Sequence, residues 1–387
     1  MRIPAQAHFC LAAVGLTLLA ACSQENQSEA PAVAPVEILN VLASDELSGI
    51  GAPANGIAFW SHPNVAFNSL IVVATTDGLV SYNVEDRSEV SRVPGLNAQG
   101  AGVSYFGFGP QADGIVATFD QDARTFALYS IDNIGRTFSP LSGGPAVRGA
   151  IRGFCFGRAL TSDAPSLFII QKGELQVYNF ARDASAPDTV ITASQALIET
   201  PDNLVSCAVD RDGVVITAAE DGSIYRLDND QSFASPFAIA NITDTGSIAV
   251  IDAAASVDDE PDGGEPSDVE SGVSGQLALL DEATGAVHLF SAEDGHFMGA
   301  VKIAQTDEIE GVDGAASMGA NGANLGGLYR DGVVAIGLRD FDTLRLIPMN
   351  GVSNALEIET GEPVNPRGLA PVVEDNDLII NPTITID

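Results

Sequence analysis

The stretch that decides the fold is GVVITAAEDGSIYRLDND, residues 213–230. It begins with an apolar run rich in β-branched residues and ends with a second short run centred on Tyr225. Between the two runs, Asp221 and Gly222 supply the positive φ angle that a tight hairpin turn requires. The stretch therefore predicts two antiparallel strands joined by a hairpin.

The same pattern occurs six times along the chain. Each copy has an apolar strand, a turn that contains Gly or Asp, and a second strand centred on an aromatic residue or Leu. The central residues are Tyr82, Tyr129, Tyr178, Tyr225, Leu289 and Leu346, at spacings of 47 to 64 residues. A strand-based repeat of roughly 40–50 residues is typical of β-propeller blades, and the turn residues disfavour helical repeats. We therefore predict an all-β fold, a six-bladed β-propeller.

The first 35 residues differ in character from the repeats. A short apolar stretch at residues 9–21 follows a single Arg and precedes Cys22 in Leu-Ala-Ala-Cys, which resembles the bacterial lipobox. We expect residues 1–21 to be a lipoprotein signal peptide, Cys22 to carry lipid, and residues 22–35 to form a flexible tether. The product would be an exported lipoprotein at the outer membrane or facing the periplasm, held to the membrane through its lipid only. An ordinary signal peptide is the alternative.

Residues 36–387 are predicted to form one propeller domain. A closed ring of blades needs a strand exchange between the chain ends, and residues 36–43 and 377–386 are the strand-like segments available for it. The longest spacing between copies contains an acidic insertion, residues 252–272, that is rich in Asp, Glu, Gly, Ser and Pro. We expect this insertion to be a solvated loop near a blade edge, with calcium binding as the alternative.

The chain is strongly acidic, with 17 basic and 52 acidic residues and a net charge of −35. Such a surface repels nucleic acid and anionic lipid headgroups and attracts cations, so we do not expect those two as partners. We also expect a monomer. Most of the carboxylates serve solubility on this interpretation, and a subset would bind Ca²⁺. Cys155 and Cys207 lie in the predicted domain, either as a disulfide or as two buried thiols.

Several chemistries are disfavoured by missing motifs. The chain has no Gly-x-x-x-x-Gly-Lys, no Cys-x-x-Cys, no His-Glu-x-x-His and no nucleophile elbow. His62, His288 and His296 are scattered, and none has a second ligand at metal spacing. These absences argue against phosphate-loop, transition-metal and serine-hydrolase chemistry. For His62 we expect a structural hydrogen bond.

Several motifs resemble those of the β-propeller phytases, which are calcium-dependent secreted phosphatases that act on inositol phosphates. Residues 57–63 (IAFWSHP) resemble the opening Pro-Ala-Ile-Trp-x-His-Pro of that family, and residues 76–82 resemble the hairpin that follows it. Residues 169–178 (IIQKGELQVY) resemble the family's Lys-bearing hairpin, residues 206–226 its most acidic blade, and residues 311–348 its last blades. The likeness covers most of residues 51–352.

This resemblance implies a site chemistry. Phytate is a polyanion, so an acidic pocket binds it only through bridging Ca²⁺ ions, which take six to eight oxygen ligands and activate water. By position, the resemblance implies that Lys172 contacts phosphate and acts in catalysis with Glu220, and that Arg226 helps to bind substrate. The implied metal ligands are Asp210, Glu220, Asp221 and Asp313.

The chain departs from the family pattern at several expected carboxylates and amides. The departures are Asn55, Gly56, the Gly100, Ala101 and Gly102 run, Gly173, Val205 and Gly246. Two hypotheses follow: a calcium-dependent, phytase-like phosphomonoesterase with an altered site, or a catalytically lapsed propeller that binds a ligand or a protein partner. The enzyme hypothesis predicts carboxylates from several blades clustered at one end of the central channel.

Overall fold

The computed structural model describes residues 36–367, with gaps at 106–113, 160–161, 184, 187, 228–231, 234, 255–274, 307–308 and 360. The chain divides into two units, Met1–Pro35 and Val36–Asp387, and only the second contains described residues. The predicted signal peptide, Cys22, the tether, residues 377–386 and most of the acidic insertion therefore lie outside the described part. No helix among the described residues is long and apolar enough to cross a membrane.

Within these residues the chain forms six sheets, which we call blades 1 to 6; their strands pair antiparallel except that β1 (Ile38–Val41) of blade 5 pairs parallel with β23 (Phe297–Ile303). Blade 1 consists of β3 (Ala54–Trp60), β4 (Leu70–Thr75), β5 (Gly78–Asn83) and β6 (Glu89–Pro94). Blade 2 consists of β7 (Ala98–Ser104), β8 (Gly114–Asp120), β9 (Thr125–Ile131) and β10 (Phe138–Leu141). Blade 3 consists of β11 (Gly153–Ala159), β12 (Ser162–Gln171), β13 (Glu174–Arg182) and β14 (Val190–Glu199).

Blades 4 to 6 complete the set. Blade 4 consists of β15 (Leu204–Val209), β16 (Val215–Ala219), β17 (Ser223–Arg226) and β18 (Ala238–Ile239). Blade 5 consists of β19 (Thr245–Ile251), β21 (Gln276–Asp281), β22 (Ala286–Ser291), β23 (Phe297–Ile303) and β1 (Ile38–Val41). Blade 6 consists of β24 (Ala315–Asn321), β25 (Val333–Leu338), β26 (Thr343–Pro348) and β2 (Asp45–Ser48). A short pair, β20 (Ala253–Ala254) with β27 (Glu362–Pro363), and one helix, α1 (Met349–Leu356), lie outside the blades.

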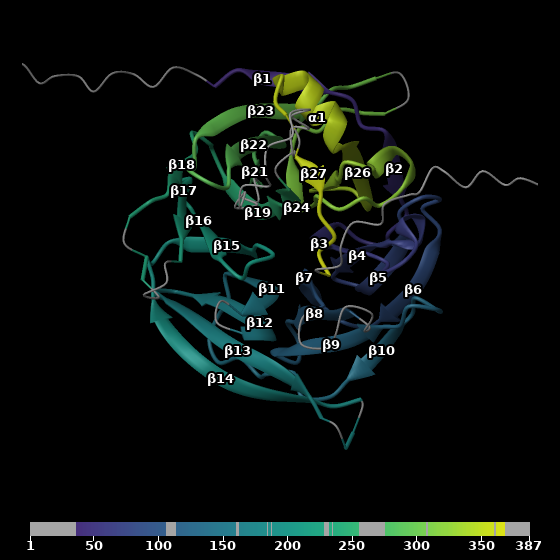
Figure 1. Cartoon of the computed structure of the whole chain (residues 1–387), viewed down its shortest axis with the longest axis vertical. Helices are drawn as coiled ribbons and strands as arrows, with labels where there is room; N and C mark the ends of the chain where they lie inside the picture. The colour runs from purple at the N-terminus through teal and green to yellow at the C-terminus, as the bar shows by residue number, and fades with distance from the viewer. Residues whose placement is uncertain are drawn as a thin grey trace, which may run out of the picture. The chain divides into compact units, whose positions relative to one another are not determined.

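The blades form a closed ring in which the first strand of each blade lies innermost (Figure 1). The first strands contact one another in the order β3, β7, β11, β15, β19, β24 and back to β3. This arrangement confirms the predicted six-bladed β-propeller. The six predicted hairpins are the second and third strands of the six blades, and Gly222 in the opening stretch has the expected positive φ of 81°.

The hydrophobic core lies between the blades. Each of the six clusters of buried side chains among the described residues joins two neighbouring blades. The cluster between blades 6 and 1, for example, contains Ile57, Val73 and Val333. Because both faces of a blade are covered, all six residues of β4 are buried, and its first five, Leu70 to Ala74, are continuously apolar instead of alternating.

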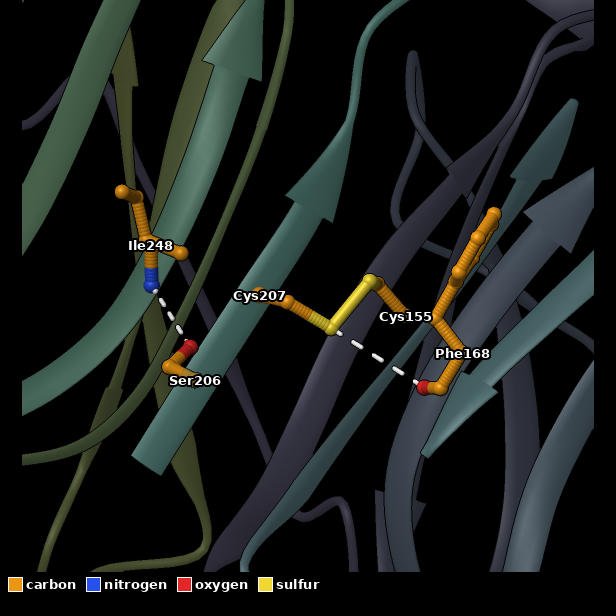
Figure 2. The surroundings of a disulfide bond; sticks show 5 residues. All are labelled: Cys155, Phe168, Ser206, Cys207 and Ile248. Carbon is orange, nitrogen blue, oxygen red and sulfur yellow. Dashed lines mark hydrogen bonds between the residues drawn. A yellow bond between two sulfur atoms is a disulfide. The ribbon is translucent and has the colours of Figure 1, made fainter. Parts of the chain in front are cut away.

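Side chains also link each first strand to the next, at all six junctions of the described ring. We call these six links the inner ring, and Figure 2 shows two of them, at the β11–β15 and β15–β19 junctions. They are Asn55 Nδ2 to Ala98 O (3.2 Å), Ser104 Oγ to Gly157 O (3.0 Å), the disulfide between Cys155 and Cys207, Ile248 N to Ser206 Oγ (3.0 Å), Met318 N to Ser247 Oγ (3.2 Å) and Ser317 Oγ to Ala54 O (2.8 Å).

The ring closes through β2, not through the segment that the sequence indicated. β2 pairs antiparallel with β26 and is the fourth strand of blade 6, so an N-terminal strand completes the last blade. The predicted closing segment, residues 36–43, instead contains β1, which pairs parallel with β23 on the outside of blade 5. Val41 of β1 packs inward there and belongs to the core cluster between blades 5 and 6, while Ile38 is exposed.

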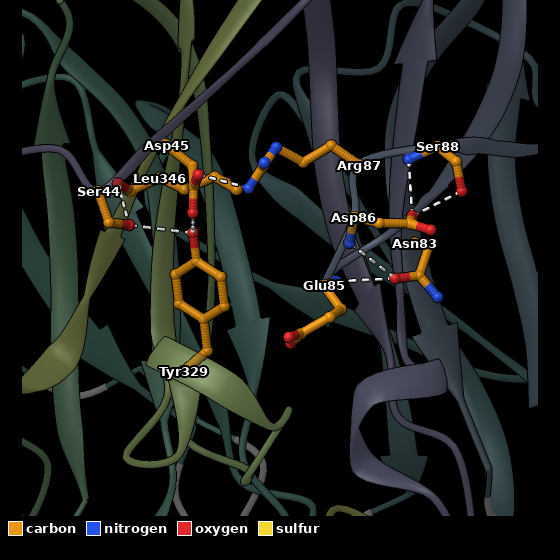
Figure 3. Close-up of polar contacts among 9 residues, drawn as sticks. All are labelled: Ser44, Asp45, Asn83, Glu85, Asp86, Arg87, Ser88, Tyr329 and Leu346. Atoms are coloured by element: carbon orange, nitrogen blue, oxygen red, sulfur yellow. Dashed lines mark hydrogen bonds and ion pairs between the residues drawn. The ribbon is translucent and has the colours of Figure 1, made fainter.

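Asp45, at the start of β2, holds the seam between blades 6 and 1 (Figure 3). Its carboxylate accepts a hydrogen bond from Tyr329 Oη at 2.6 Å and forms an ion pair with Arg87 of blade 1. Ser44 Oγ lies 3.0 Å from Tyr329 Oη and donates to Leu346 O at 3.2 Å. Burial, and then the bond to Asp45, raise the pKa of the Tyr329 hydroxyl, so it stays protonated as a donor.

We predict that Ser317→Ala lowers the free energy of unfolding by about 1–2 kcal/mol, because the buried carbonyl of Ala54 loses its donor from the inner ring. Urea unfolding would measure the change. Ser139→Ala, on the exposed outer strand β10, is the matched control and should change stability by less than about 0.5 kcal/mol. Equal effects of the two substitutions would contradict a structural role for the inner ring.

Candidate functional site

A cavity of about 410 Å³ occupies the centre of the ring, and we call it the central funnel. Its wall comes from the first strands of all six blades and consists largely of backbone and small side chains. Each blade contributes to the lining, for example, in the order of blades 1 to 6, through Gly56, Ala101, Phe154, Ser206, Ser247 and Ala316. This volume falls within the range of small-molecule sites in proteins, roughly 300–1,000 Å³.

The two ends of the funnel have different surroundings. We call one end the turn end, because the first strand of each blade begins there, close to the turn between the second and third strands. We call the other end, where the first strands finish, the far end. β19 has seven residues, and a strand rises about 3.3 Å per residue, so about 20 Å separate the two ends.

The structure describes the first strands of all six blades. In five of them, the pairing with the second strand of the blade is irregular near the turn end. The register shifts lie between Ala54 and Gly56, Gln99 and Gly102, Leu204 and Ser206, Thr245 and Ile248, and Ala315 and Ser317. Such bulges bend a strand, re-aim its side chains and are frequent next to active sites. We therefore regard the turn end as the mouth of the funnel, the opening through which a ligand would enter.

Two groups of ion pairs lie at the turn end. Arg152 Nη1 is 2.8 Å from Glu220 Oε1, while Arg339 Nη2 is 3.1 Å from Glu282 Oε2 and 3.5 Å from Asp244 Oδ2. Burial, and then the neighbouring Asp244, raise the pKa of the Glu282 carboxyl. Arg152 and Glu282 also line the funnel, so both signs of charge meet at its mouth despite the acidic composition.

Four predicted site residues lie at the turn end, but they do not form one group. Lys172 is exposed in the turn between β12 and β13, and Glu220 pairs with Arg152 as described. Asp221 accepts a hydrogen bond from Ser223 N at 3.1 Å, which is a turn-stabilising role. Asp313 has a side chain that is 97% exposed and binds Lys302 Nζ at 2.8 Å, which lowers the pKa of its carboxyl.

The other two predicted site residues lie at the far end. Asp210 Oδ1 accepts the backbone N–H groups of Asp212 at 2.9 Å and Val214 at 2.8 Å, so it also stabilises a turn. Arg226 lies 5.7 Å from the ring centre of Phe237, outside the funnel lining. The structure therefore places Asp210 and Arg226 away from Glu220, and the predicted metal ligands are divided between the two ends.

The residues present do not fit the calcium site that the resemblance implies. A protein-bound Ca²⁺ needs six to eight oxygen ligands. No group of three or more His, Cys, Asp or Glu in the described part of the chain could hold a metal ion. No catalytic step through calcium follows from these residues.

Close packing accounts for two of the departures from the family pattern. A Cβ atom on Gly56 would lie 2.4 Å from Gly100 Cα, and one on Gly246 would lie 2.5 Å from Glu282 Cγ. Real Cβ atoms do not approach other atoms so closely. At Gly56 the close atoms are backbone atoms of β7, so a carboxylate side chain there would force β3 and β7 apart, whereas at Gly246 it would displace the side chain of Glu282.

A C-terminal segment crosses the far end of the funnel. In Figure 1, β27 and the residues that follow it up to Arg367 lie over the inner part of the ring. β27 pairs with β20 beside blade 5, and Arg367 reaches blades 1 and 2. Its Nε donates to Ser61 O at 2.8 Å, and its guanidinium lies 4.3 Å from the ring centre of Tyr105 and 5.2 Å from that of Trp60.

The start of the acidic insertion is ordered, in contrast to the expected solvated loop. Asp252 is partly buried, and the next two residues form β20, whose Ala253 is 7% exposed. Burial, and then the nearby Asp210, raise the pKa of the Asp252 carboxyl to about 7. The remainder of the insertion, residues 255–272, lies outside the described residues.

Histidine and cysteine roles follow from their contacts. His62 Nδ1 lies 3.0 Å from Val65 N and accepts its N–H, while Nε2 lies 2.9 Å from Asn133 O, which confirms the expected structural role.

The two alternatives for the cysteines resolve as a disulfide, which joins β11 and β15 within the inner ring. Cys155 and Cys207 also line the funnel, and both are almost fully buried.

Comparison with known proteins adds little to this geometry. No family model matches the chain, and no curated protein matches it. Among solved structures, the chain is similar to one described as KlHsv2 with loop 6CD replaced by a Gly-Ser linker, with a TM-score of 0.36 and 11% identity over 73% of this chain and 74% of that one. We draw nothing about function from a likeness at this level, and the resemblance to β-propeller phytases stays an interpretation of sequence motifs.

We predict that the double variant Cys155→Ala/Cys207→Ala loses about 2–4 kcal/mol of unfolding free energy, because the disulfide closes a loop with a sequence separation of 52. Urea unfolding with and without dithiothreitol would measure it. The reductant should move the wild-type midpoint towards that of the variant and leave the variant unchanged. Identical midpoints for the oxidised wild type and the variant would contradict the prediction.

We predict that Asp252→Asn stabilises the protein at pH 8 and has little effect at pH 4. The pKa of Asp252 is about 7 in the folded chain against an ordinary value of 3.8, so the wild type loses stability as pH rises through that interval. The shift of about 3 pKa units sets an upper limit of about 4 kcal/mol. Thermal unfolding at pH 4, 6 and 8 would measure the difference, with the exposed Asp340→Asn as the control for losing one negative charge. A gain that is independent of pH would contradict the prediction.

Proposed function

We propose that this chain is a binding propeller, not a phosphatase, and that it holds a small organic molecule at the turn end of the central funnel. The observation that carries the proposal is the funnel itself, about 410 Å³ in volume and walled by all six blades. Its mouth is formed where five first strands bulge, and bulges are frequent beside binding sites.

The lining indicates what kind of ligand would fit. The wall is uncharged over most of its area, with Ser206, Ser247 and backbone groups as polar contacts. At the mouth, Arg152 and Glu220 form one ion pair, and the guanidinium of Arg339 sits between two carboxylates. A neutral or zwitterionic molecule suits these surroundings, because a polyanion would meet arginines that already bind carboxylates.

The placement of the candidate carboxylates supports binding over calcium-dependent catalysis. Glu220 pairs with an arginine at the turn end, Asp313 pairs with Lys302 on an exposed surface, and Asp210 lies at the far end. A phosphatase that works through calcium needs carboxylates converging on shared ions. The sequence motifs that resemble phytases would then reflect the shared architecture of a propeller, whose fold does not determine its function.

We predict that ligands found by thermal-shift screening of a fragment library lose their effect in Ala316→Trp, which fills the funnel from β24. A ligand at about 100 times its Kd should stabilise the wild type by about 2.7 kcal/mol and raise Tm by roughly 2 °C or more. Ala123→Trp, in an exposed turn of blade 2 outside the funnel lining, is the matched control and should keep the response.

Two results would contradict the proposal. One is a set of ligands that stabilise wild type and Ala316→Trp equally, which would place binding elsewhere. The other is release of phosphate from phytate that depends on millimolar Ca²⁺ and disappears in Glu220→Ala, since that would make the chain an enzyme.

A further inference from the structure

The outer edges of the six blades are protected unequally. Four of the outermost strands in the described ring, β10, β18, β1 and β2, have four residues or fewer, and β6 carries Glu89, Arg92 and Pro94. Short length, charge and proline are the devices by which proteins keep sheet edges from pairing with other chains. β14 of blade 3 has ten residues, VITASQALIE, with no proline and a single charge at its last position, and its one protecting device is a bulge at Gln195.

The edge of β14 is also exposed and apolar. Ile191 is 54% exposed and Leu197 is 64% exposed, although both are large aliphatic residues. β14 is the last strand in the order β11, β12, β13, β14. Its further hydrogen bonds to backbone that the described residues show are near its start, where Val190 N donates to Ser142 O and Thr192 Oγ1 donates to Gly143 O. Figure 1 shows β14 as a long curved strand on the outside of the ring. Residues 191–199 therefore present a strand edge that another extended chain can extend.

Charge decides between a second copy and a different partner. Acidic residues flank the edge at both ends, with Asp188 before β14 and Glu199 and Asp202 at and after its end. Two copies paired through β14 would bring acidic ends together in either strand direction, and each copy carries a net charge of −35. The partner strand that fits is uncharged and β-branched in its middle and basic at both ends.

We propose that the edge of β14 binds such a segment of another protein, which adds to blade 3 as a fifth strand. Backbone hydrogen bonds along residues 191–194 and 196–199, on either side of the bulge at Gln195, would supply affinity, and contacts with Ile191 and Leu197 would select apolar residues at the matching positions. Blade 5 already has a fifth strand, β1, so a blade of this ring accommodates one. This surface is separate from the central funnel.

The test uses the full chain and a fluorescein-labelled synthetic peptide of about ten residues, with alternating Val and Thr between Lys pairs. Fluorescence anisotropy should show saturable binding to the wild type and about tenfold weaker binding to Ile191→Lys/Leu197→Lys. Ser139→Lys, which adds a lysine to outer strand β10, is the matched control and should bind as the wild type does. Circular dichroism would verify that each variant is folded.

Further measurements keep the proposal falsifiable. A peptide of the same composition with prolines at alternate positions should not bind, because it cannot form the backbone ladder. The proposal is overturned if the peptide does not bind, or if it binds wild type and Ile191→Lys/Leu197→Lys equally. It is also overturned if sedimentation shows a wild-type dimer that Ile191→Lys/Leu197→Lys dissociates, since the occupant would then be a second copy.

Discussion

The pairing of β2 with β26 is the constraint on which the rest of this propeller depends. It places an N-terminal strand on the last blade and lets Asp45 bind Tyr329 of blade 6 and Arg87 of blade 1. The core cluster between blades 6 and 1 forms only because this seam is closed. The central funnel needs the first strands of all six blades, so its wall exists only in the closed ring.

The blades could be predicted from sequence because their information is local. Each hairpin consists of two apolar strands and a turn such as Asp221-Gly222, all within about twenty residues. The closing strand could not be predicted in this way, since Asp45–Ser48 is short and polar and its partner lies far along the chain. The apolar residues of β1 were a misleading signal, because they reflect packing against blade 5 and not ring closure.

The site was harder to predict than the fold, because residues that are close in sequence do not have to be close in the folded chain. Asp210 and Glu220 are ten positions apart, but β16 runs between them and carries the chain from the far end to the turn end. Arg152 is 68 positions from Glu220 and comes from another blade, so no local pattern could indicate their ion pair. Gly56 shows a similar conflict, because its close approach to the backbone of Gly100 and Ala101 excludes the side chain that a metal site would need.

The seam also determines when this protein can finish folding. Ser44 and Leu346, which meet there, are separated by 302 positions. During synthesis, β2 emerges long before β26, the strand with which it pairs, so both ends of the ring stay open until β26 has been made. Exposed edges in such partly folded chains favour aggregation. Ring closure therefore waits for the sixth blade, and a chain that stops short of β26 leaves β2 without the strand that it pairs with.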